Sequence, residues 1–526
     1  MSVVDPVWAG LAELSAAFES RALSPVDVVG ALLARIKARD ALHAYIAIYE
    51  YEARLAAEAA DRAITSGHRI GPLHGIPIAL KDLVDLQGRV TTGGSKVWID
   101  RVSPVTATLA ERLIGAGMIV LGKTHTVEFA MGSFGTNTHL GTPWNPWDLA
   151  VHRTPGGSSS GSAVAVAAGL APAAIGTDTG GSVRLPAAWC GIVGLKVTAG
   201  RISTHGVLPL SFTLDTPGPM ARSVEDAALL FRALNGPDPQ DPPTLAWTPS
   251  DPMPTLRRGV KGLRLAVMPE DERLGVDAEV LAAYDASVTK FAGLGAEIVR
   301  VSLPNRFADY AAGVGRIIGA EGYRFVGHLV DDASLPVDPH IRPRIQVGRG
   351  MSARDYLLAL AEREEHRRAF VRALADVDAL LTPTAQTAAI PIAKVDQSGT
   401  AVLHPGGELS RAVRAGGAER LHDGRASDLT PDPLPRRARG HGAAHRLDLR
   451  AGERVEGAQA ARAALSAQRL RCIQTRTIFM ASWMVASGPE MRKVAPSSSS
   501  VVSRRHLRCE HHVAIAFSSD SRSRPK

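Results

Sequence analysis

The chain contains 526 residues, of which 45% are hydrophobic and 21% are charged. This composition can bury a large core, so it excludes wholesale disorder, collagen and small disulfide-stapled folds. The three cysteines, Cys190, Cys472 and Cys509, cannot form a disulfide framework, which favours a reducing compartment such as the cytoplasm.

The first elements along the chain are predicted from helical and strand-like spacing. Residues 11–40 space Leu, Val and Ile at helical intervals, and Ser24 followed by Pro25 is typical of a helix start. Two helices joined by a turn are therefore expected there. The run IPIAL at 76–80 is short and apolar, as a buried strand is. Residues 107–122 have the pattern of a helix, a turn and a strand.

Helices and strands continue to alternate further along the chain. Residues 264–270 and 378–384 resemble buried strands, and residues 280–295 and 363–377 have amphipathic helical spacing. This alternation predicts an α/β fold. We expect one large domain in which helices flank a mixed β-sheet.

Membrane contact is not expected from the hydrophobic pattern. The N-terminal residues lack the basic start and apolar run of a secretory signal. The most apolar stretch, residues 163–175, is interrupted by Gly169 and Pro172 and is shorter than the roughly 20 residues of a spanning helix. These features predict a cytoplasmic protein.

Glycine and serine are concentrated in residues 154–186, TPGGSSSGSAVAVAAGLAPAAIGTDTGGSVRLP. Two polar loops there enclose an Ala and Val segment that must be buried, so the loops are held at the edge of a core. Gly180 and Gly181 can turn successive N–H groups inward beside the hydroxyl of Ser182. Such a concavity suits the developing oxyanion of acyl transfer.

A serine nucleophile needs a base, and the sequence offers two arrangements. GSSSG at 157–161 matches a nucleophile elbow centred on Ser159, which would require a histidine. That elbow follows a strand directly, whereas the preceding HRTPG is not strand-like. The other candidate is Lys81, which follows the apolar run at 76–80 and could act as a base if burial lowers its pKa.

Four separated blocks resemble the amidase signature family of serine amidases. The longest, residues 156–203, begins GGSSSGSAVAVAAGLAPAAIGTDTGGS. HGIPIALKDLVD at 74–85, GKTHTVEFAMGSFGTNT at 122–138 and LDTPGPMARSVEDAALL at 214–230 resemble the same family in the expected order. The resemblance implies the family's α/β fold and amide hydrolysis without a metal or cofactor.

The resemblance also implies a catalytic triad of a lysine, a serine that follows a cis peptide bond and a second serine. These residues correspond to Lys81, Ser158 and Ser182 in this chain. Neutral Lys81 would hold Ser158, which would relay the proton from the nucleophile Ser182. The implied oxyanion hole is formed by the N–H groups of Thr179, Gly180, Gly181 and Ser182.

Further site residues are implied around this triad. Ser159 would support the relay, and Asp178 would order the loop. The backbone of Met131 and Gly132 would line the substrate site. Arg184 could pair either with a substrate carboxylate or with a structural acid.

Three other signals are set aside. GMIVLGKT at 117–124 matches a phosphate-binding loop, but its MIVL resembles a strand rather than the required loop. Cys190 has apolar neighbours and is expected to be a buried small side chain. The CEHH at 509–512 lies in a segment without a fold signal, so no metal site is expected.

The resemblance covers about residues 8–395, most clearly 70–235, and then ends abruptly, so residues 1–395 are expected to form the amidase signature domain. Residues 401–526 hold 22 Lys and Arg against 11 Asp and Glu, whereas residues 1–400 hold 38 against 41. We interpret residues 396–526 as an atypical Arg-rich tail, either disordered or the product of a frameshift or replacement. Nucleic-acid binding is not expected of this chain. An RNA-binding tail is the alternative interpretation, because this basic segment is the one candidate for such contact.

The expected function is hydrolysis of a carboxylic amide to an acid and ammonia or an amine through an acyl-enzyme. EFAMGS at 128–133 also resembles the glutaminase component of tRNA-dependent amidotransferases, which is the first alternative. An inactive truncated scaffold is the second alternative. The expected partner is a small amide substrate, and a homo-oligomer remains open.

Overall fold

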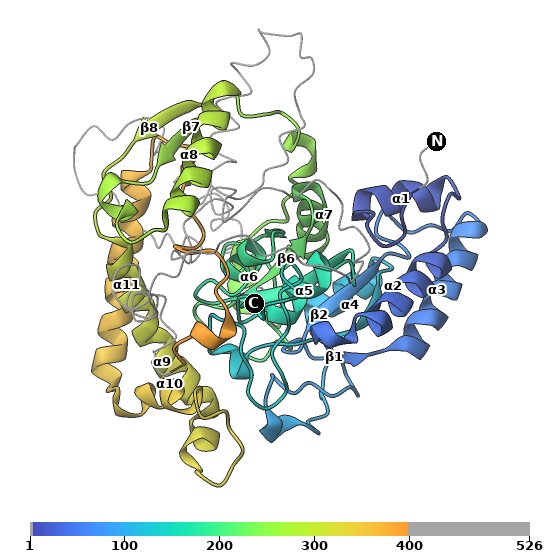
Figure 1. The fold of residues 1–526 in the computed structure, drawn as a ribbon, viewed down its shortest axis with the longest axis horizontal. Helices are drawn as coiled ribbons and strands as arrows, with labels where there is room; N and C mark the ends of the chain where they lie inside the picture. The colour runs from blue at the N-terminus through green and yellow to red at the C-terminus, as the bar shows by residue number, and fades with distance from the viewer. Residues whose placement is uncertain (1–3, 398–526) are drawn as a thin grey trace, which may run out of the picture. The chain divides into compact units, whose positions relative to one another are not determined.

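The computed structural model describes residues 4–397 (Figure 1). Its strands are β1 (Tyr45–Ile48), β2 (Pro77–Lys81), β3 (Ile119–Thr124), β4 (Ala173–Asp178), β5 (Val193–Gly194), β6 (Thr216–Ala221), β7 (Arg264–Val267), β8 (Glu297–Arg300) and β9 (Ala379–Leu381). Its α-helices are α1 (Leu11–Glu19), α2 (Pro25–Ala38), α3 (Glu50–Thr65), α4 (Thr108–Gly115), α5 (Ser160–Ala167), α6 (Arg184–Trp189), α7 (Val224–Leu234), α8 (Ala278–Gly293), α9 (Phe307–Asp331), α10 (Arg342–Gln346) and α11 (Ala353–Ala373).

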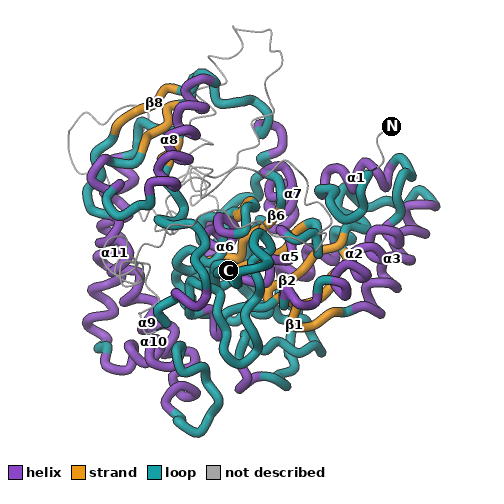
Figure 2. Tube along the Cα trace, viewed as in Figure 1, coloured by secondary structure: helices purple, strands orange, loops and turns teal. Residues whose placement is uncertain are grey.

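The larger sheet is mixed and has the strand order β1-β3-β2-β4-β6-β5. Strands β2, β3 and β4 run parallel to one another, whereas β1 and β6 pair antiparallel with β3 and β4. Because β2 and β4 are adjacent and parallel, their carboxyl ends meet at one edge of the sheet. Figure 2 labels three strands of this sheet, β1, β2 and β6, in orange.

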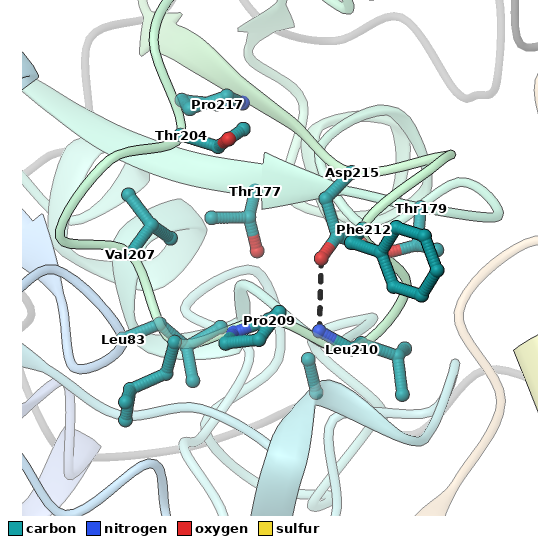
Figure 3. Close-up of a pocket in the computed structure, with 12 residues that line it drawn as sticks. Leu83, Thr177, Thr179, Thr204, Val207, Pro209, Leu210, Phe212, Asp215 and Pro217 are labelled. Carbon is teal, nitrogen blue, oxygen red and sulfur yellow. Dashed lines mark hydrogen bonds between the residues drawn. The ribbon is translucent and has the colours of Figure 1, made fainter. Parts of the chain in front are cut away.

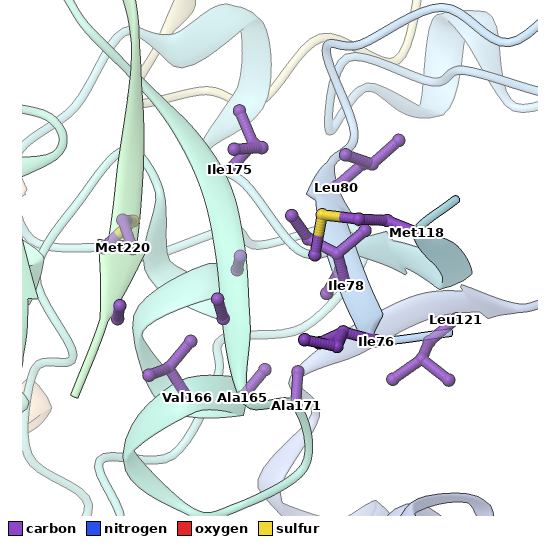
Figure 4. Packing of buried hydrophobic residues seen from close by; sticks show 14 of the residues in the cluster. Ile76, Ile78, Leu80, Met118, Leu121, Ala165, Val166, Ala171, Ile175 and Met220 are labelled. Carbon is purple, nitrogen blue, oxygen red and sulfur yellow. The ribbon is translucent and has the colours of Figure 1, made fainter. Parts of the chain in front are cut away.

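Buried side chains of this sheet and of α5 form the main core. All five residues of β2 and all six of β4 are buried, as expected of parallel strands covered on both faces. Figure 4 shows Ile78 and Leu80 from β2, Ile175 from β4 and Val166 from α5 within this cluster. The expected apolar strand at 76–80 and the buried Ala and Val segment are therefore confirmed.

The second sheet has the order β8-β7-β9, and all its pairs are parallel. It has its own apolar cluster, which includes Leu265 from β7, Tyr284 and Phe291 from α8, and Phe370 from α11. The α/β class with a mixed sheet is confirmed. Residues 264–381 also contain a second, all-parallel sheet, which was not predicted separately from the first.

Local signals predicted several helix boundaries and missed others. Ser24 accepts a hydrogen bond from Asp27 N (3.1 Å) and caps α2, whose first residue is Pro25, as the spacing predicts. The 25-residue helix α9 was not predicted. Glycine weakens its helical signal, and packing against α10 and α11 stabilises it instead. Helix α11 also begins ten residues before the expected 363.

The predicted tail, residues 396–526, lies outside the described part of the chain except for its first two residues. Within residues 4–397, no helix combines the length and apolar character that a bilayer crossing requires.

Candidate active site

Lys81 lies at the carboxyl end of β2, beside the neighbouring strand β4. Its side chain is fully buried. Its Nζ donates to Ser158 Oγ at 2.7 Å and to Thr177 Oγ1 at 2.8 Å. The parallel register, which pairs Leu80 with Ile175, brings Lys81 near Thr177. Two of the predicted residues, Lys81 and Ser158, are therefore in direct contact.

Burial changes the acid–base behaviour of this lysine. Loss of solvent lowers the pKa of Lys81 to about 7, against the opposing charges of Asp215 and Asp178. An amine with this pKa is largely unprotonated in mildly alkaline solution, so it can accept a proton. The site thus contains a buried group suited to general-base chemistry at neutral pH.

Ser158 is held by the loop that precedes α5. The Gly157–Ser158 peptide bond is cis. The Ser158 carbonyl accepts from Val127 N at 3.2 Å and from Thr126 Oγ1 at 3.0 Å. A Cβ on Gly157 would lie 2.7 Å from the Gly132 carbonyl oxygen, so glycine is required there. Gly132 thus packs against the loop that positions Ser158.

Ser182 follows β4 and is joined to this loop through the backbone. Ser159 N donates to the Ser182 carbonyl at 3.3 Å. The Ser159 hydroxyl also bridges the N–H and carbonyl of Thr177, at 3.2 Å each. Ser158 and Ser159 are fully buried, whereas Ser182 is partly exposed. Ser182 is therefore the hydroxyl of the three that solvent or a substrate can reach.

The loop that carries Ser182 is organised by an ion pair. Asp178 Oδ1 accepts from Arg184 Nη2, and Asp178 Oδ2 accepts from Arg184 Nε, both at 2.9 Å. Burial alone would raise the pKa of Asp178, but Arg184 outweighs it and lowers the pKa to about 2. This bidentate pair favours the loop-anchoring role of Arg184 over a substrate contact.

The glycine loop differs in one respect from the expected oxyanion hole. Gly181 has a φ of 130°, which favours glycine. Its N–H donates to Asp178 Oδ1 at 2.9 Å. Gly181 therefore orders the loop, and its N–H is already engaged by Asp178. The N–H groups of Thr179, Gly180 and Ser182 remain the predicted oxyanion donors. Met131 is buried, and its carbonyl accepts from Arg344 Nη1 at 3.5 Å.

A cavity of about 200 Å³ adjoins the buried lysine. Figure 3 shows the Thr177 hydroxyl and the Asp215 carboxylate on one side of this space and Leu83 and Pro209 on the other. We call this space the Asp215 cavity. Its lining residues are Leu83, Ala130, Thr177, Thr179, Thr204, Val207, Leu208, Pro209, Leu210, Phe212, Asp215 and Pro217.

Two residues of this site, Thr177 and Asp215, were not predicted from the sequence. Thr177 holds Lys81, and Asp215 accepts from Thr179 Oγ1 at 2.5 Å. Burial raises the pKa of Asp215 to about 6. Alternation along β4 places Thr177 on the face opposite Gly176 and Asp178, but the sequence does not show which face meets Lys81. The contact of Asp215 depends on the pairing of β4 with β6, which the sequence does not specify.

Two of the signals that were set aside have structural roles, and the third, CEHH at 509–512, lies outside the described residues. Lys123, in the phosphate-loop match, lies within β3 and donates to the Val84 carbonyl at 2.5 Å and to Thr91 Oγ1 at 2.7 Å. Cys190 is buried, and burial raises the pKa of its thiol. Within residues 4–397, no group of three or more His, Cys, Asp or Glu side chains is placed to hold a metal ion.

Comparison with known proteins identifies the family. The Amidase family model matches residues 27–404. The glutamyl-tRNA(Gln) amidotransferase A chain of Geobacter sulfurreducens is 41% identical over 73% of this chain and 84% of its own length. Its counterpart from Anaeromyxobacter dehalogenans is 46% identical over 56% of this chain and 60% of its own length.

Solved structures agree with this result. The native peptide amidase of Stenotrophomonas maltophilia matches with a TM-score of 0.64 and 31% identity, over 73% of this chain and 85% of its own. A bacterial aryl acylamidase of the amidase signature family matches with a TM-score of 0.67 and 27% identity, over 74% of this chain and 82% of its own. The resemblance inferred from the four sequence blocks is confirmed. The chain therefore belongs to the Amidase family, whose members are hydrolases of carbon–nitrogen amide bonds.

Proposed function

We propose that this protein hydrolyses a small carboxylic amide through an acyl-enzyme formed on Ser182. The observation that carries the proposal is the 2.7 Å contact between the buried Lys81 amine and the Ser158 hydroxyl. A fully buried lysine with its pKa lowered to about 7 is poised for proton transfer rather than for charge pairing.

In the proposed first step, the Ser182 hydroxyl oxygen attacks the carbonyl carbon of the amide. Ser158 accepts the Ser182 proton and passes its own proton to neutral Lys81. The resulting Lys81 ammonium returns a proton through Ser158 to the leaving nitrogen, and the carbon–nitrogen bond breaks. Water then attacks the acyl-enzyme by the same relay, releasing the acid and restoring Ser182.

The proposed oxyanion hole uses the N–H groups of Thr179, Gly180 and Ser182. The Asp178–Arg184 pair supports this role, because it fixes the loop through Gly181 N (2.9 Å) and Val183 N (3.1 Å). Fixed donors stabilise a developing negative charge without reorganising during the reaction. Each donor of this kind contributes about 3 to 4 kcal/mol in the transition state.

Ammonia release from a panel of aliphatic, aromatic and amino-acid amides tests the proposal. The wild-type protein should hydrolyse at least one class, and Ser182→Ala should lower its kcat/KM by about 10⁴-fold or more. Ser287→Ala is a suitable control, because Ser287 lies on α8 and its hydroxyl donates to the Ala283 carbonyl within that helix. Undiminished hydrolysis by the Ser182→Ala protein would exclude the acyl-enzyme on this residue.

A second candidate function is that of the glutaminase component of a tRNA-dependent amidotransferase. It is supported by the names of relatives such as the amidotransferase chain of Geobacter sulfurreducens. This function would require partner proteins and glutamine as the amide. Co-purification with such partners, together with glutamine hydrolysis that rises in the complex, would favour it over a free-standing amidase.

A further inference from the structure

The Asp215 cavity differs chemically from its surroundings. Eight of its twelve lining residues are apolar, three are threonines, and Asp215 is the one charged side chain among these described residues. No Lys or Arg of the described chain is in that lining set. The cavity therefore combines an apolar wall with a single acid.

The cavity is linked to the proposed catalytic groups through two of its lining residues. Thr177 lines it and contacts Lys81 Nζ at 2.8 Å. Thr179, another lining residue, begins the loop that ends at Ser182. A substrate whose carbonyl lies at Ser182 therefore has this cavity within reach of its remaining atoms.

Asp215 is arranged as a hydrogen-bond acceptor. Oδ2 accepts from Leu210 N at 2.8 Å and from Ser211 N at 3.0 Å, and Oδ1 accepts from Thr179 Oγ1. Each carboxylate oxygen can accept about two hydrogen bonds, so Oδ1 retains capacity for another donor. With its pKa near 6, this carboxylate is ionised under the conditions in which Lys81 is neutral.

The loop that precedes Asp215 is held in place by hydrogen bonds to Glu321. Glu321, on α9, accepts from Ser211 Oγ at 2.5 Å and from Thr213 N and Oγ1 at 3.1 and 2.7 Å. Tyr356 from α11 also donates to Glu321 at 2.7 Å. A binding group supported in this way is preorganised, which strengthens selectivity.

We propose that the Asp215 cavity is a substrate subsite that takes an apolar arm ending in a hydrogen-bond donor, such as an ammonium group. This inference rests on the proposed amidase function and deepens it by naming a substrate class. An ammonium end would donate to Asp215 while its methylenes contact Leu83, Val207 and Phe212. A carboxylate end would face Asp215 as a like charge with no basic lining residue to offset it.

Three amides that share one methylene arm test this proposal: hexanamide, 5-aminopentanamide and adipic acid monoamide. They end in a methyl, an ammonium and a carboxylate group. At about pH 8 the wild-type kcat/KM should be highest for 5-aminopentanamide and at least about tenfold lower for adipic acid monoamide. Equal rates, or a preference for the carboxylate, would overturn the proposal.

The Asp215→Asn variant gives the decisive comparison. Asp215 also influences the pKa of Lys81, so Asp215→Asn should change the rate for every substrate. The ratio of the kcat/KM values for two substrates cancels this change, because it affects both substrates equally. The preference for 5-aminopentanamide over hexanamide should fall by about tenfold or more, mainly through KM, and an unchanged ratio would contradict the subsite.

Asp226→Asn is the matched control. Asp226 is also a buried carboxylate that accepts a backbone N–H, from Ala12 at 3.1 Å, but it lies on α7 and does not line the cavity. It should leave the substrate ratio unchanged.

Calorimetric binding of the three amides to the Ser182→Ala protein separates this inference from the proposed function. Tighter binding of 5-aminopentanamide, even where the wild type hydrolyses nothing, would retain the subsite and reject the amidase mechanism. Hydrolysis by the wild type without any binding preference among the three amides would retain the amidase function and reject the subsite.

Discussion

The two sheets differ in how closely their residues are packed. In the six-stranded sheet, every residue of β2 and β4 is buried. A Cβ on Gly161 in α5 would lie 2.3 Å from the Ala44 carbonyl oxygen. In the three-stranded sheet, none of the four residues of β8 is fully buried, and Gly293 on α8 has no neighbour within 4 Å of an added Cβ.

This difference agrees with the position of the proposed catalytic site. A lysine whose pKa must be lowered needs complete desolvation and fixed partners. The tightly packed edge of β2 and β4 supplies both, since Lys81 is fully buried and its partners Ser158 and Thr177 are fully and nearly fully buried. In the three-stranded sheet, by contrast, the buried strand positions among the described residues are apolar: Leu265, Ala266, Leu380 and Leu381.

Among the changes that compare the two sheets, removing the buried amine of Lys81 should have the largest effect. Lys81→Met keeps a similar apolar length but removes the proposed base, so kcat/KM should fall by about 10³-fold. Steady-state amide hydrolysis and circular dichroism together check this outcome. Lys290→Met, on α8 beside the three-stranded sheet, should keep wild-type activity. A Lys81→Met enzyme that remains folded and fully active would contradict the proton relay.

A methyl group added at Gly161, which packs tightly against the backbone of Ala44, should destabilise the fold. Gly161→Ala would drive a Cβ against backbone atoms of Ala44 and His125, and overpacking of this kind costs about 2 to 3 kcal/mol. Urea unfolding followed by fluorescence should show the lower midpoint. An unchanged midpoint would mean that the packing around α5 can relax.

The pH dependence of turnover should report the buried lysine. Because burial lowers the pKa of Lys81 to about 7, the reactive neutral amine is lost as the pH falls below that value. We expect kcat/KM to decrease about tenfold per pH unit below 7 and to level off above 8. A profile that is flat between pH 5 and 9 would exclude Lys81 as the base.

The smallest effect on stability should come from Gly293, where an added Cβ meets open space. Gly293→Ala adds a methyl group in α8 where no atom lies within 4 Å, and alanine favours a helix over glycine by up to about 1 kcal/mol. The unfolding midpoint should rise slightly, opposite in sign to Gly161→Ala. A lower unfolding midpoint for Gly293→Ala would contradict the looser packing around α8.

Much of the six-stranded sheet was predictable because its signals are local. The apolar run at 76–80 predicted β2, and the Gly-rich stretch predicted the loops that hold Ser158 and Ser182. Thr177 and Asp215 were missed because their importance arises from contacts between neighbouring strands. Helix α9 was missed because tertiary packing outweighs its glycine content.

Labelling with a fluorophosphonate probe, followed by peptide mapping, tests the central claim most directly. The account predicts one adduct on Ser182, which is absent in Ser182→Ala and strongly slowed in Lys81→Met. An adduct on another serine, or labelling that persists in Ser182→Ala, would contradict the proposed nucleophile.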